Sequence, residues 1–323
     1  YGHALKGREF VRQREYADAE REIDLSLARD PHYVPALADK SMLRYRAGDA
    51  QGAVAAATHA LSVDTYDPAS NYYYGLASLR LGHLADARDG FDVAALDVGY
   101  RAAARLQLAR MSARAGEWTR AADLARRSLE VDALNGDARH LLAVVLRKAG
   151  RLDDARQAAA AALALDPLHH GARFETWRLD GNAASREAFV SGIRNEMPHE
   201  TFLELALWYQ DLGLGADASD LLGAAPQVPE VLYWRAWLDR ERDAAASARL
   251  LRQAGDASPR LVLPFRPESV AVFDWAAAHD PGWKPRYYRA LLARALGDVA
   301  DARQRLAALG DQPDFAAFYA CLL

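Results

Sequence analysis

The stretch Ala138–Pro167, ARHLLAVVLRKAGRLDDARQAAAAALALDP, decides the fold of this chain. Leu142, Ala143 and Leu146 lie on one face of a first helix, because their spacing of i, i+1 and i+4 matches the helical period. Gly150 ends that helix, since glycine adopts the left-handed carboxy-terminal conformation without steric cost. The stretch therefore begins with a helix that stops at a tight turn.

A second helix follows the glycine. Asp153 and Asp154 favour its amino-terminal end, where the helix dipole is positive. Its packing face carries small residues, namely Ala155, Ala159 and Ala162. Pro167 closes the unit because proline cannot continue a helix and disfavours the α conformation of the residue before it. The stretch thus predicts two antiparallel helices joined by a short turn.

The same features recur upstream at intervals of thirty-four residues. The repeated glycines are Gly48, Gly82, Gly116 and Gly150, and the repeated alanines are Ala19, Ala53, Ala87, Ala121 and Ala155. Aspartate repeats with one gap, at Asp30, Asp64, Asp132 and Asp166. The alanines have a physical reason, since a bulky side chain at a helix crossing would overpack the hairpin by about 1–3 kcal/mol. A fixed period of this length is typical of stacked repeats.

The period and the hairpin pattern resemble the tetratricopeptide repeat family. Five units cover residues 1–167; Arg14 replaces the turn glycine of the first, and the second has two extra residues before Pro68. The resemblance implies an all-α, right-handed α-solenoid of antiparallel helix hairpins. Such an array escapes the size limit of a single core, because each repeat packs only on its neighbours.

Residues 168–323 lose the period but keep helical patterns. Helices are predicted at Arg173–Arg178, Ser185–Glu196, Glu200–Leu212, Ala216–Leu222, Glu230–Asp239 and Ala244–Ala254. Two segments, 201–225 and 287–310, look like degenerate hairpins of the same kind. The one β-like run, LVLPF at 261–265, contains a proline that argues against a strand. We expect an irregular continuation of the array, with an independent second domain as the alternative.

Several segments are also similar to one group of large bacterial proteins. They include IRNEMPHETFLELALWYQDLGL, SPRLVLPFRPES and WKPRYYRALL. In that group a helical array follows an amino-terminal, β-rich domain of the galactose-mutarotase-like, carbohydrate-processing kind. The resemblance implies that any enzyme lies in that neighbouring domain. The start at Tyr1 rather than Met agrees with a part of a longer protein.

Composition excludes several classes of partner. The formal net charge of −4 over 323 residues gives no reason to expect nucleic acid or an anionic membrane surface. No apolar run approaches the ~20 residues that span a bilayer. The single cysteine, Cys321, allows no intrachain disulfide. We expect a cytoplasmic protein, although a cysteine-poor exported bacterial protein would have the same composition.

Catalytic and metal-binding signatures do not occur in the sequence. It contains no HExxH, CxxC or GxSxG motif and no glycine-rich phosphate loop. The adjacent side chains of His169 and His170 diverge, which disfavours a metal site there. Paired acids such as Glu200 and Glu204 are interpreted as solvated residues near helix starts. We therefore expect a protein that is not an enzyme and that needs no cofactor or metal.

Two sets of residues are candidates for binding. The first is a row of cations thirty-four residues apart, Arg12, Arg46, Arg80, Arg114 and Lys148. These cations either grip carboxylates or phosphates of a partner, or simply complement the dipole in the last turn of each helix for ~0.3–1 kcal/mol. The second set has the register of the inner, concave face: Arg8, Met42, Tyr72, Tyr73, Gln107, Arg110, His140 and Arg178.

The inner-face set resembles, in part, the tetratricopeptide grooves that capture a terminal carboxylate. Those grooves use Lys, Arg and Asn, whereas this set lacks the Lys–Asn pair. Tyr72 to Tyr74 form either a stacking platform for a peptide side chain or sugar, or part of the core, since three consecutive helical residues cannot face one way. Trp234 and Trp237, at i and i+3 in an apolar helix, are expected to be buried.

Three functions follow. The preferred one is a non-catalytic scaffold that binds a protein, a peptide or a neighbouring domain of its own polypeptide. The second is a glycan-acting enzyme or carbohydrate-binding module that uses the tryptophan-rich second half, and the third is a peptide-binding adaptor.

Overall fold

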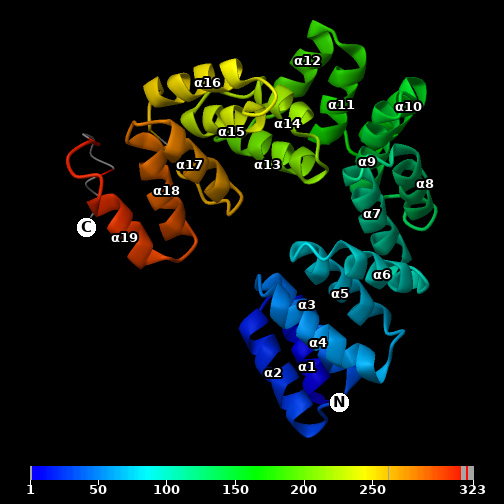
Figure 1. Ribbon diagram of the computed structural model, residues 1–323. Coiled ribbons are helices and arrows are strands. Elements are labelled where there is room, and N and C mark those ends of the chain that lie inside the picture. Colours follow the sequence, from blue (N-terminus) through cyan, green and yellow to red (C-terminus); the bar gives the residue numbers. More distant parts are fainter. Residues whose placement is uncertain (1, 261, 314–317, 319–323) are drawn as a thin grey trace. The chain divides into compact units, whose positions relative to one another are not determined.

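The computed structural model describes residues 2–260, 262–313 and 318 (Figure 1). Within these residues it contains nineteen α-helices and no strand, which confirms the all-α class. No helix among them has the length and the apolar composition needed to cross a membrane. The chain divides into two compact units, Tyr1–Leu179 and Asp180–Leu323, and each is described by itself.

The first unit is a stack of helix hairpins. Its helices are α1 (Gly2–Arg12), α2 (Tyr16–Arg29), α3 (Val34–Arg46), α4 (Ala50–Val63), α5 (Pro68–Arg80), α6 (Leu84–Ala94), α7 (Val98–Arg114), α8 (Trp118–Leu129), α9 (Gly136–Lys148), α10 (Leu152–Leu165) and α11 (His170–Asp180). Each odd-numbered helix up to α9 pairs with the next helix, and α1, α3, α5, α7 and α9 also contact one another in turn. We call the surface of these five the first-helix face. The unit extends past Pro167 to include most of α11.

The repeated alanines lie at the helix crossings. Ala19, Ala53, Ala87, Ala121 and Ala155 are all fully buried. The first helices carry small residues at the same period, Gly7, Ser41, Gly75, Ala109 and Ala143. The first three of these lie against the backbone of Ala19, Ala53 and Ala87. A Cβ atom on Gly75 would lie 3.1 Å from the carbonyl oxygen of Ala87 and 2.7 Å from the Phe91 ring. The close approach expected from the sequence is therefore present, and it leaves no room for a larger side chain.

The four repeated glycines are required for their backbone conformation. Gly48, Gly82, Gly116 and Gly150 have φ between 75° and 85°, and a Cβ on any of them would meet no atom within 4 Å. Arg14 occupies the equivalent turn of the first hairpin with φ of 63°. The left-handed region disfavours residues that carry a Cβ.

Replacing Arg14 with glycine should therefore stabilise the first hairpin by about 0.5–1 kcal/mol, after the entropy that glycine loses on folding is subtracted. Hydrogen exchange of α1 and α2 amides would measure the change. Gly48→Ala is the matched control, because it makes the reverse change at the next equivalent turn and should cost about 1 kcal/mol. An Arg14→Gly variant that exchanges faster than the parent would contradict the expectation.

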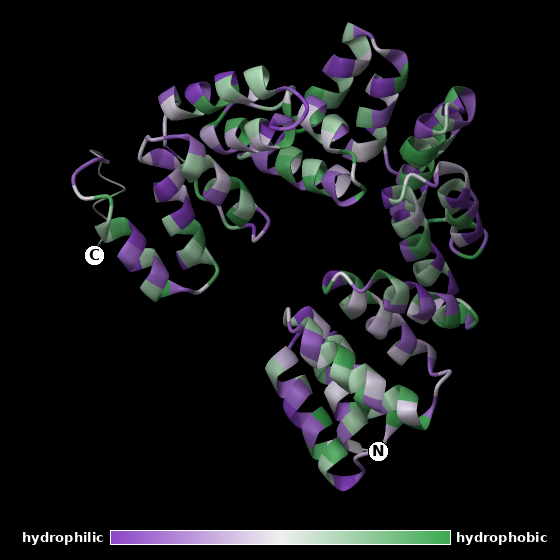
Figure 2. Ribbon diagram, viewed as in Figure 1, coloured by the Kyte–Doolittle hydropathy of each residue, from purple (hydrophilic) through white to green (hydrophobic). Residues whose placement is uncertain are grey.

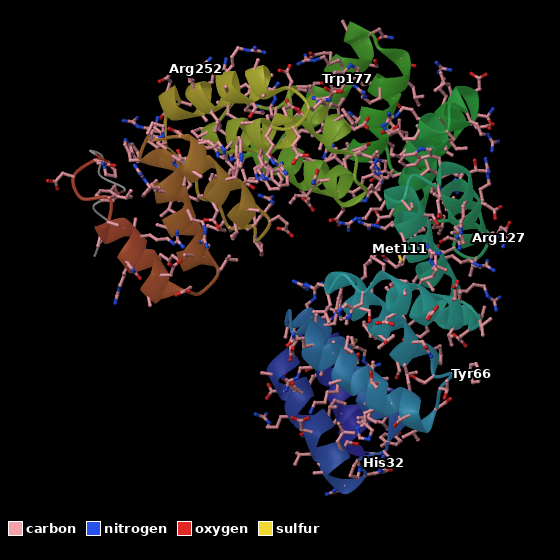
Figure 3. All side chains as sticks on the ribbon, in the orientation of Figure 1. His32, Tyr66, Met111, Arg127, Trp177 and Arg252 are labelled. Atoms are coloured by element: carbon pink, nitrogen blue, oxygen red, sulfur yellow. The ribbon has the colours of Figure 1, made fainter. Side chains whose placement is uncertain are left out.

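The repeated aspartates fix the turns between hairpins. The Oδ1 atoms of Asp30, Asp64, Asp132 and Asp166 accept the backbone N–H two residues later, at 3.0, 3.0, 3.3 and 2.9 Å. The residues that donate are His32, Tyr66, Leu134 and Leu168, and all four are exposed, with Tyr66 labelled in Figure 3. The aspartate period thus reflects a turn that presents one side chain at each tip. In the loop that breaks the period, Asp97 accepts instead from Gly99 at 2.8 Å.

The second unit is also built of helices, with less regular spacing. They are α12 (Ala183–Val190), α13 (Pro198–Asp211), α14 (Gly215–Leu222), α15 (Pro229–Asp239), α16 (Ala244–Asp256), α17 (Ser269–His279), α18 (Lys284–Ala295) and α19 (Val299–Ala307). Helix α13 contacts α14, and α18 contacts α19, so both predicted degenerate hairpins are present. Both turn at a glycine with positive φ, Gly213 and Gly297.

The second unit departs from the sequence expectations in two places. The helix predicted to reach Glu196 ends at Val190, because Gly192 and Pro198 disfavour its continuation. Helix α17 was not predicted. The β-like run contains no strand at Val262–Phe265, and Leu261 lies outside the described residues. Figure 2 shows apolar and polar residues mixed along the helices of both units, as expected for helices that bury only one face.

Candidate interaction surface

A row of tyrosines crosses three helices of the first-helix face. Tyr45 on α3 contacts Tyr73 on α5, with ring centroids 6.4 Å apart. Tyr73 contacts Tyr72 at 5.5 Å, and Tyr72 contacts Tyr100 on α7 at 5.4 Å. We call these four residues the tyrosine row. These distances are typical of favourable aromatic pairs, so the four rings form one continuous set of contacts. Tyr72 and Tyr100 also pack against the buried core around Phe91, so the row is partly core and partly surface.

Three members of the tyrosine row have hydroxyl groups whose pKa is raised. Burial raises the pKa of Tyr72, Tyr73 and Tyr100, while a hydrogen bond with the Gln107 side chain opposes the shift at Tyr72. None of these rings is fully buried. Tyr74 differs, because its electrostatic neighbours are Asp86 and Asp89 of α6. The tyrosine row can therefore offer a partner two kinds of contact, namely aromatic rings and hydroxyl groups that form hydrogen bonds.

An ion pair borders the tyrosine row. Arg8 Nε on α1 donates to Asp39 Oδ2 on α3 at 2.7 Å, and Arg8 and Tyr100 influence each other electrostatically. The hydrogen bond to Asp39 raises the pKa of Arg8. Burial raises the pKa of Asp39, although the Arg8 guanidinium opposes that shift. The pair fixes the Arg8 side chain, so this cation is already occupied within the chain.

The periodic cations occupy the last turns of the first helices, as the dipole interpretation requires. Two of them also stack on tyrosines: Arg46 lies 5.4 Å from the centre of the Tyr16 ring, and Arg80 lies 6.0 Å from that of Tyr45. Arg46 also donates to the Tyr16 hydroxyl at 2.9 Å. Stacking of this kind holds a guanidinium in place while leaving its charge unneutralised.

Three of these cations are available to a partner. Arg46, Arg80 and Arg114 are exposed, and among the residues that the structure describes none of them pairs with a carboxylate. We call them the arginine ladder. Arg12 differs, because it forms an ion pair with Glu9. Since α3, α5 and α7 pack side by side, successive members of the ladder are separated by about one interhelical distance, roughly 10 Å.

The structure brings only part of the predicted inner-face set together. Tyr72, Tyr73, Gln107 and Arg110 lie in one neighbourhood on α5 and α7, and Arg8 joins it through Tyr100. Met42 packs against the core of the first repeat. Arg178 is exposed on α11, at the end of the unit. Sequence reasoning missed Tyr45 and Tyr100, although Tyr100 follows the exposed Tyr66 by thirty-four residues.

His140 does not lie on the surface. Its side chain is 2% exposed, and a Cβ on Gly171 of α11 would come within 2.3 Å of the imidazole. Burial, with the nearby His169, lowers its pKa well below the usual value, so the ring is neutral. The expectation that His140 lies on the inner face rests on its position within one repeat. That position gives no information about α11, which covers the ring. We therefore leave His140 out of the candidate surface.

The tryptophans of the second unit are mostly half-buried. Trp234 is buried and donates from Nε1 to Ser269 Oγ at 3.0 Å. Trp237 is half-buried, with the Arg240 guanidinium 4.2 Å from its ring centre.

Glu200, interpreted from the sequence as solvated, is 17% exposed and paired with Arg266. Its partner comes from a distant loop, which helix position alone could not indicate.

Within the described residues no group of three potential metal ligands occurs. The His169 ring instead contacts His140, with centroids 5.3 Å apart.

A hollow of about 490 Å³ lies between α2, α3 and α4 of the first unit. Its lining includes Leu37, Lys40, Arg44 and His59.

Comparison with known proteins identifies the fold. No family model and no curated protein matches this chain. Among solved structures it is similar to PilW, a type IV pilus biogenesis factor, with 21% identity over 65% of this chain and 95% of that one and a TM-score of 0.52. It is also similar to Pseudomonas aeruginosa pilF, with 16% identity, coverage of 66% and 94%, and a TM-score of 0.54.

A tetratricopeptide repeat protein from Parabacteroides merdae matches with 14% identity over 80% of this chain and 93% of that one, at a TM-score of 0.48. The helices of the described residues and the likeness to PilW and pilF show an all-α helical solenoid. The stacked first helices and the glycine turns of the first unit agree with the repeated hairpins expected from the thirty-four-residue period.

Proposed function

We propose that this protein is a non-catalytic scaffold that binds another protein or peptide segment on the first-helix face of its first unit. The observation that carries the proposal is the arginine ladder beside the tyrosine row. Exposed charges in a folded protein usually find a partner within the chain or remain mobile in water. Here Arg46 and Arg80 are instead held on aromatic rings with their charge unneutralised.

The partner segment that fits this surface is acidic and extended. Guanidinium groups bind carboxylates in a two-pronged geometry. An extended chain advances ~3.3 Å per residue, so the ladder spacing of about 10 Å corresponds to about three residues. The tyrosine row adds apolar contact area and hydroxyl groups beside the cations.

A binding measurement tests the proposal. A fluorescein-labelled peptide with glutamate at every third position is titrated with the full chain at low salt. The triple variant Arg46→Ala, Arg80→Ala, Arg114→Ala should weaken binding about tenfold or more, equivalent to ~1.4 kcal/mol or more. Raising the salt from 50 to 300 mM should weaken binding by the parent protein, because the charges are at the surface.

A charge-matched control separates the ladder from general electrostatics. The triple variant Arg21→Ala, Arg127→Ala, Arg303→Ala removes three exposed arginines from second helices of the hairpins and should leave the affinity nearly unchanged. Equal losses in the two triple variants would mean that binding follows net charge alone, and the proposed surface would be wrong.

We further propose that the natural partner is a neighbouring domain of the same polypeptide, of the galactose-mutarotase-like kind. The sequence resemblance in the second unit supports this. Pull-down with that domain, expressed separately from the full reading frame, is the direct measurement. An absence of association at high micromolar concentration would reject the neighbouring domain while leaving the peptide measurement unaffected. The cytoplasmic location remains a prediction from composition.

A further inference from the structure

The exposed His32 and the half-buried His59 meet on the side of the first unit that holds the hollow. His32 lies in the turn between α2 and α3, where it is labelled in Figure 3, and His59 lies on α4. The Nδ1 atom of His32 is 3.1 Å from the Nε2 atom of His59. The two rings are nearly perpendicular, at 87°, with centroids 5.2 Å apart. Neither histidine belongs to the candidate interaction surface.

The backbone beneath both rings is fixed. Asp30 accepts the N–H of His32 through its side chain at 3.0 Å and the N–H of Tyr33 through its carbonyl at 3.2 Å. His59 lies between Ala57 and Ala60 on α4, and both alanines are fully buried. The two imidazoles are therefore presented from rigid positions, although the rings themselves are at the surface. Rigid presentation lowers the entropic cost of binding one ion with both rings.

The separation of the two nitrogens matches a metal chelate. Imidazole nitrogens bind Zn²⁺ and similar ions at about 2.0–2.1 Å, which places two neighbouring ligands of one ion roughly 2.9–3.4 Å apart in square-planar or tetrahedral geometry. In the metal-free pair one ring donates an N–H to the other. Moving that proton to the far nitrogen of the same ring frees both lone pairs, and no oxidant or reductant is involved.

We propose that His32 and His59 chelate one divalent transition-metal ion, with water in the remaining coordination positions. Imidazole ligands select Cu²⁺, Ni²⁺ and Zn²⁺ over Mg²⁺ and Ca²⁺, and Cu²⁺ should bind most tightly. His59 also lines the hollow of about 490 Å³, so the ion lies at its rim. The positions held by water are open to a ligand supplied from outside the chain.

Calorimetric titration of the full chain, without an affinity tag, tests the site. With Cu²⁺ at pH 7.5 we expect one tight site per chain, and Zn²⁺ should bind more weakly to the same site. His32→Ala and His59→Ala should each weaken Cu²⁺ binding at least tenfold, and the loss in the double variant should be smaller than the sum of the two single losses. Electron paramagnetic resonance of the Cu²⁺ complex should show two nitrogen ligands in the parent and one in each single variant.

The control is His83→Ala, which removes another exposed histidine whose nearest charged partner is Asp86 at 4.0 Å. It should leave Cu²⁺ affinity unchanged. The chelate is wrong if both single variants retain the parent affinity. The chelate is also wrong if the loss of Cu²⁺ affinity in the double variant equals the sum of the two single losses, because additive losses would indicate two independent imidazoles.

Discussion

Replacing Arg147 with alanine is expected to lower the free energy of unfolding of the first unit by about 3–5 kcal/mol. Arg147 on α9 donates from Nε and Nη2 to the two carboxylate oxygens of Glu175 on α11, at 2.6 and 2.9 Å. The Arg147 side chain is 11% exposed and that of Glu175 is fully buried. Alanine would leave a negative charge in the interior without its guanidinium, which is the costly way to break a buried pair.

Denaturant unfolding followed by tryptophan fluorescence would measure this loss. Trp177 is a suitable reporter because it lies on α11 with Glu175, 5.5 Å from the Phe174 ring. The double variant Arg147→Met, Glu175→Leu removes both charges and should recover most of the loss. Arg127→Ala breaks an exposed pair with Asp123 and should cost less than about 1 kcal/mol. A loss that small for Arg147→Ala would show that the buried pair is not stabilising α11.

The second large effect is expected from pH, and it concerns Glu230 in the second unit. This carboxyl group is fully buried on α15 and accepts one hydrogen bond, from Ser269 Oγ at 3.2 Å. Burial raises its pKa from 4.5 to about 7, and the nearby Glu200 carboxylate adds to the shift. Ser269, Arg266 and His199 oppose the shift but do not cancel it.

The sign of the effect follows from proton binding. Between pH 4.5 and about 7 the folded protein keeps the Glu230 proton while the unfolded chain has lost it. Stability from this group is therefore complete below pH 4.5 and falls as the pH rises to about 7. At 1.36 kcal/mol per pH unit the total loss is roughly 3 kcal/mol. Above pH 7 this contribution should no longer change.

Glu230→Gln isolates that contribution, because glutamine stays neutral at every pH. The stability of the parent relative to this variant should fall by roughly 3 kcal/mol between pH 4.5 and 8. Hydrogen exchange of α15 and α17 amides, corrected for the intrinsic pH dependence, would measure it. Glu204→Gln is the control, since Glu204 is exposed on α13 and should leave the profile unchanged. If the stability of the parent changes with pH in the same way as that of Glu230→Gln, the pKa of Glu230 is not raised.

The local part of the fold was predictable from the sequence, because its causes lie within one repeat. The turn at Gly150 needs a positive φ, and the crossing at Ala155 needs a small side chain. Both requirements repeat every thirty-four residues, so the period itself indicated the hairpins. Arg14 is the exception that the period predicts, and its backbone retains the left-handed conformation of the glycines.

The candidate surface was predictable only in part. The arginine ladder follows the period and was found, whereas the tyrosine row includes Tyr45 and Tyr100, which lie outside the inner-face set. Their contacts with Tyr73 and Tyr72 join different repeats. Such contacts depend on how each first helix leans on the next, and no spacing within one repeat records that.

The sequence by itself determined that this chain is a helical-hairpin array and which residues turn it. Only the tertiary structure decided which polar groups are buried. Arg147 and Lys148 are adjacent cations at the end of α9, yet Arg147 is held in a buried ion pair by α11. Glu200 and Glu204 are both acids early in α13, yet only Glu200 meets an arginine from a distant loop. Burial is a property of neighbouring elements, and a repeat pattern read along one helix does not contain those neighbours.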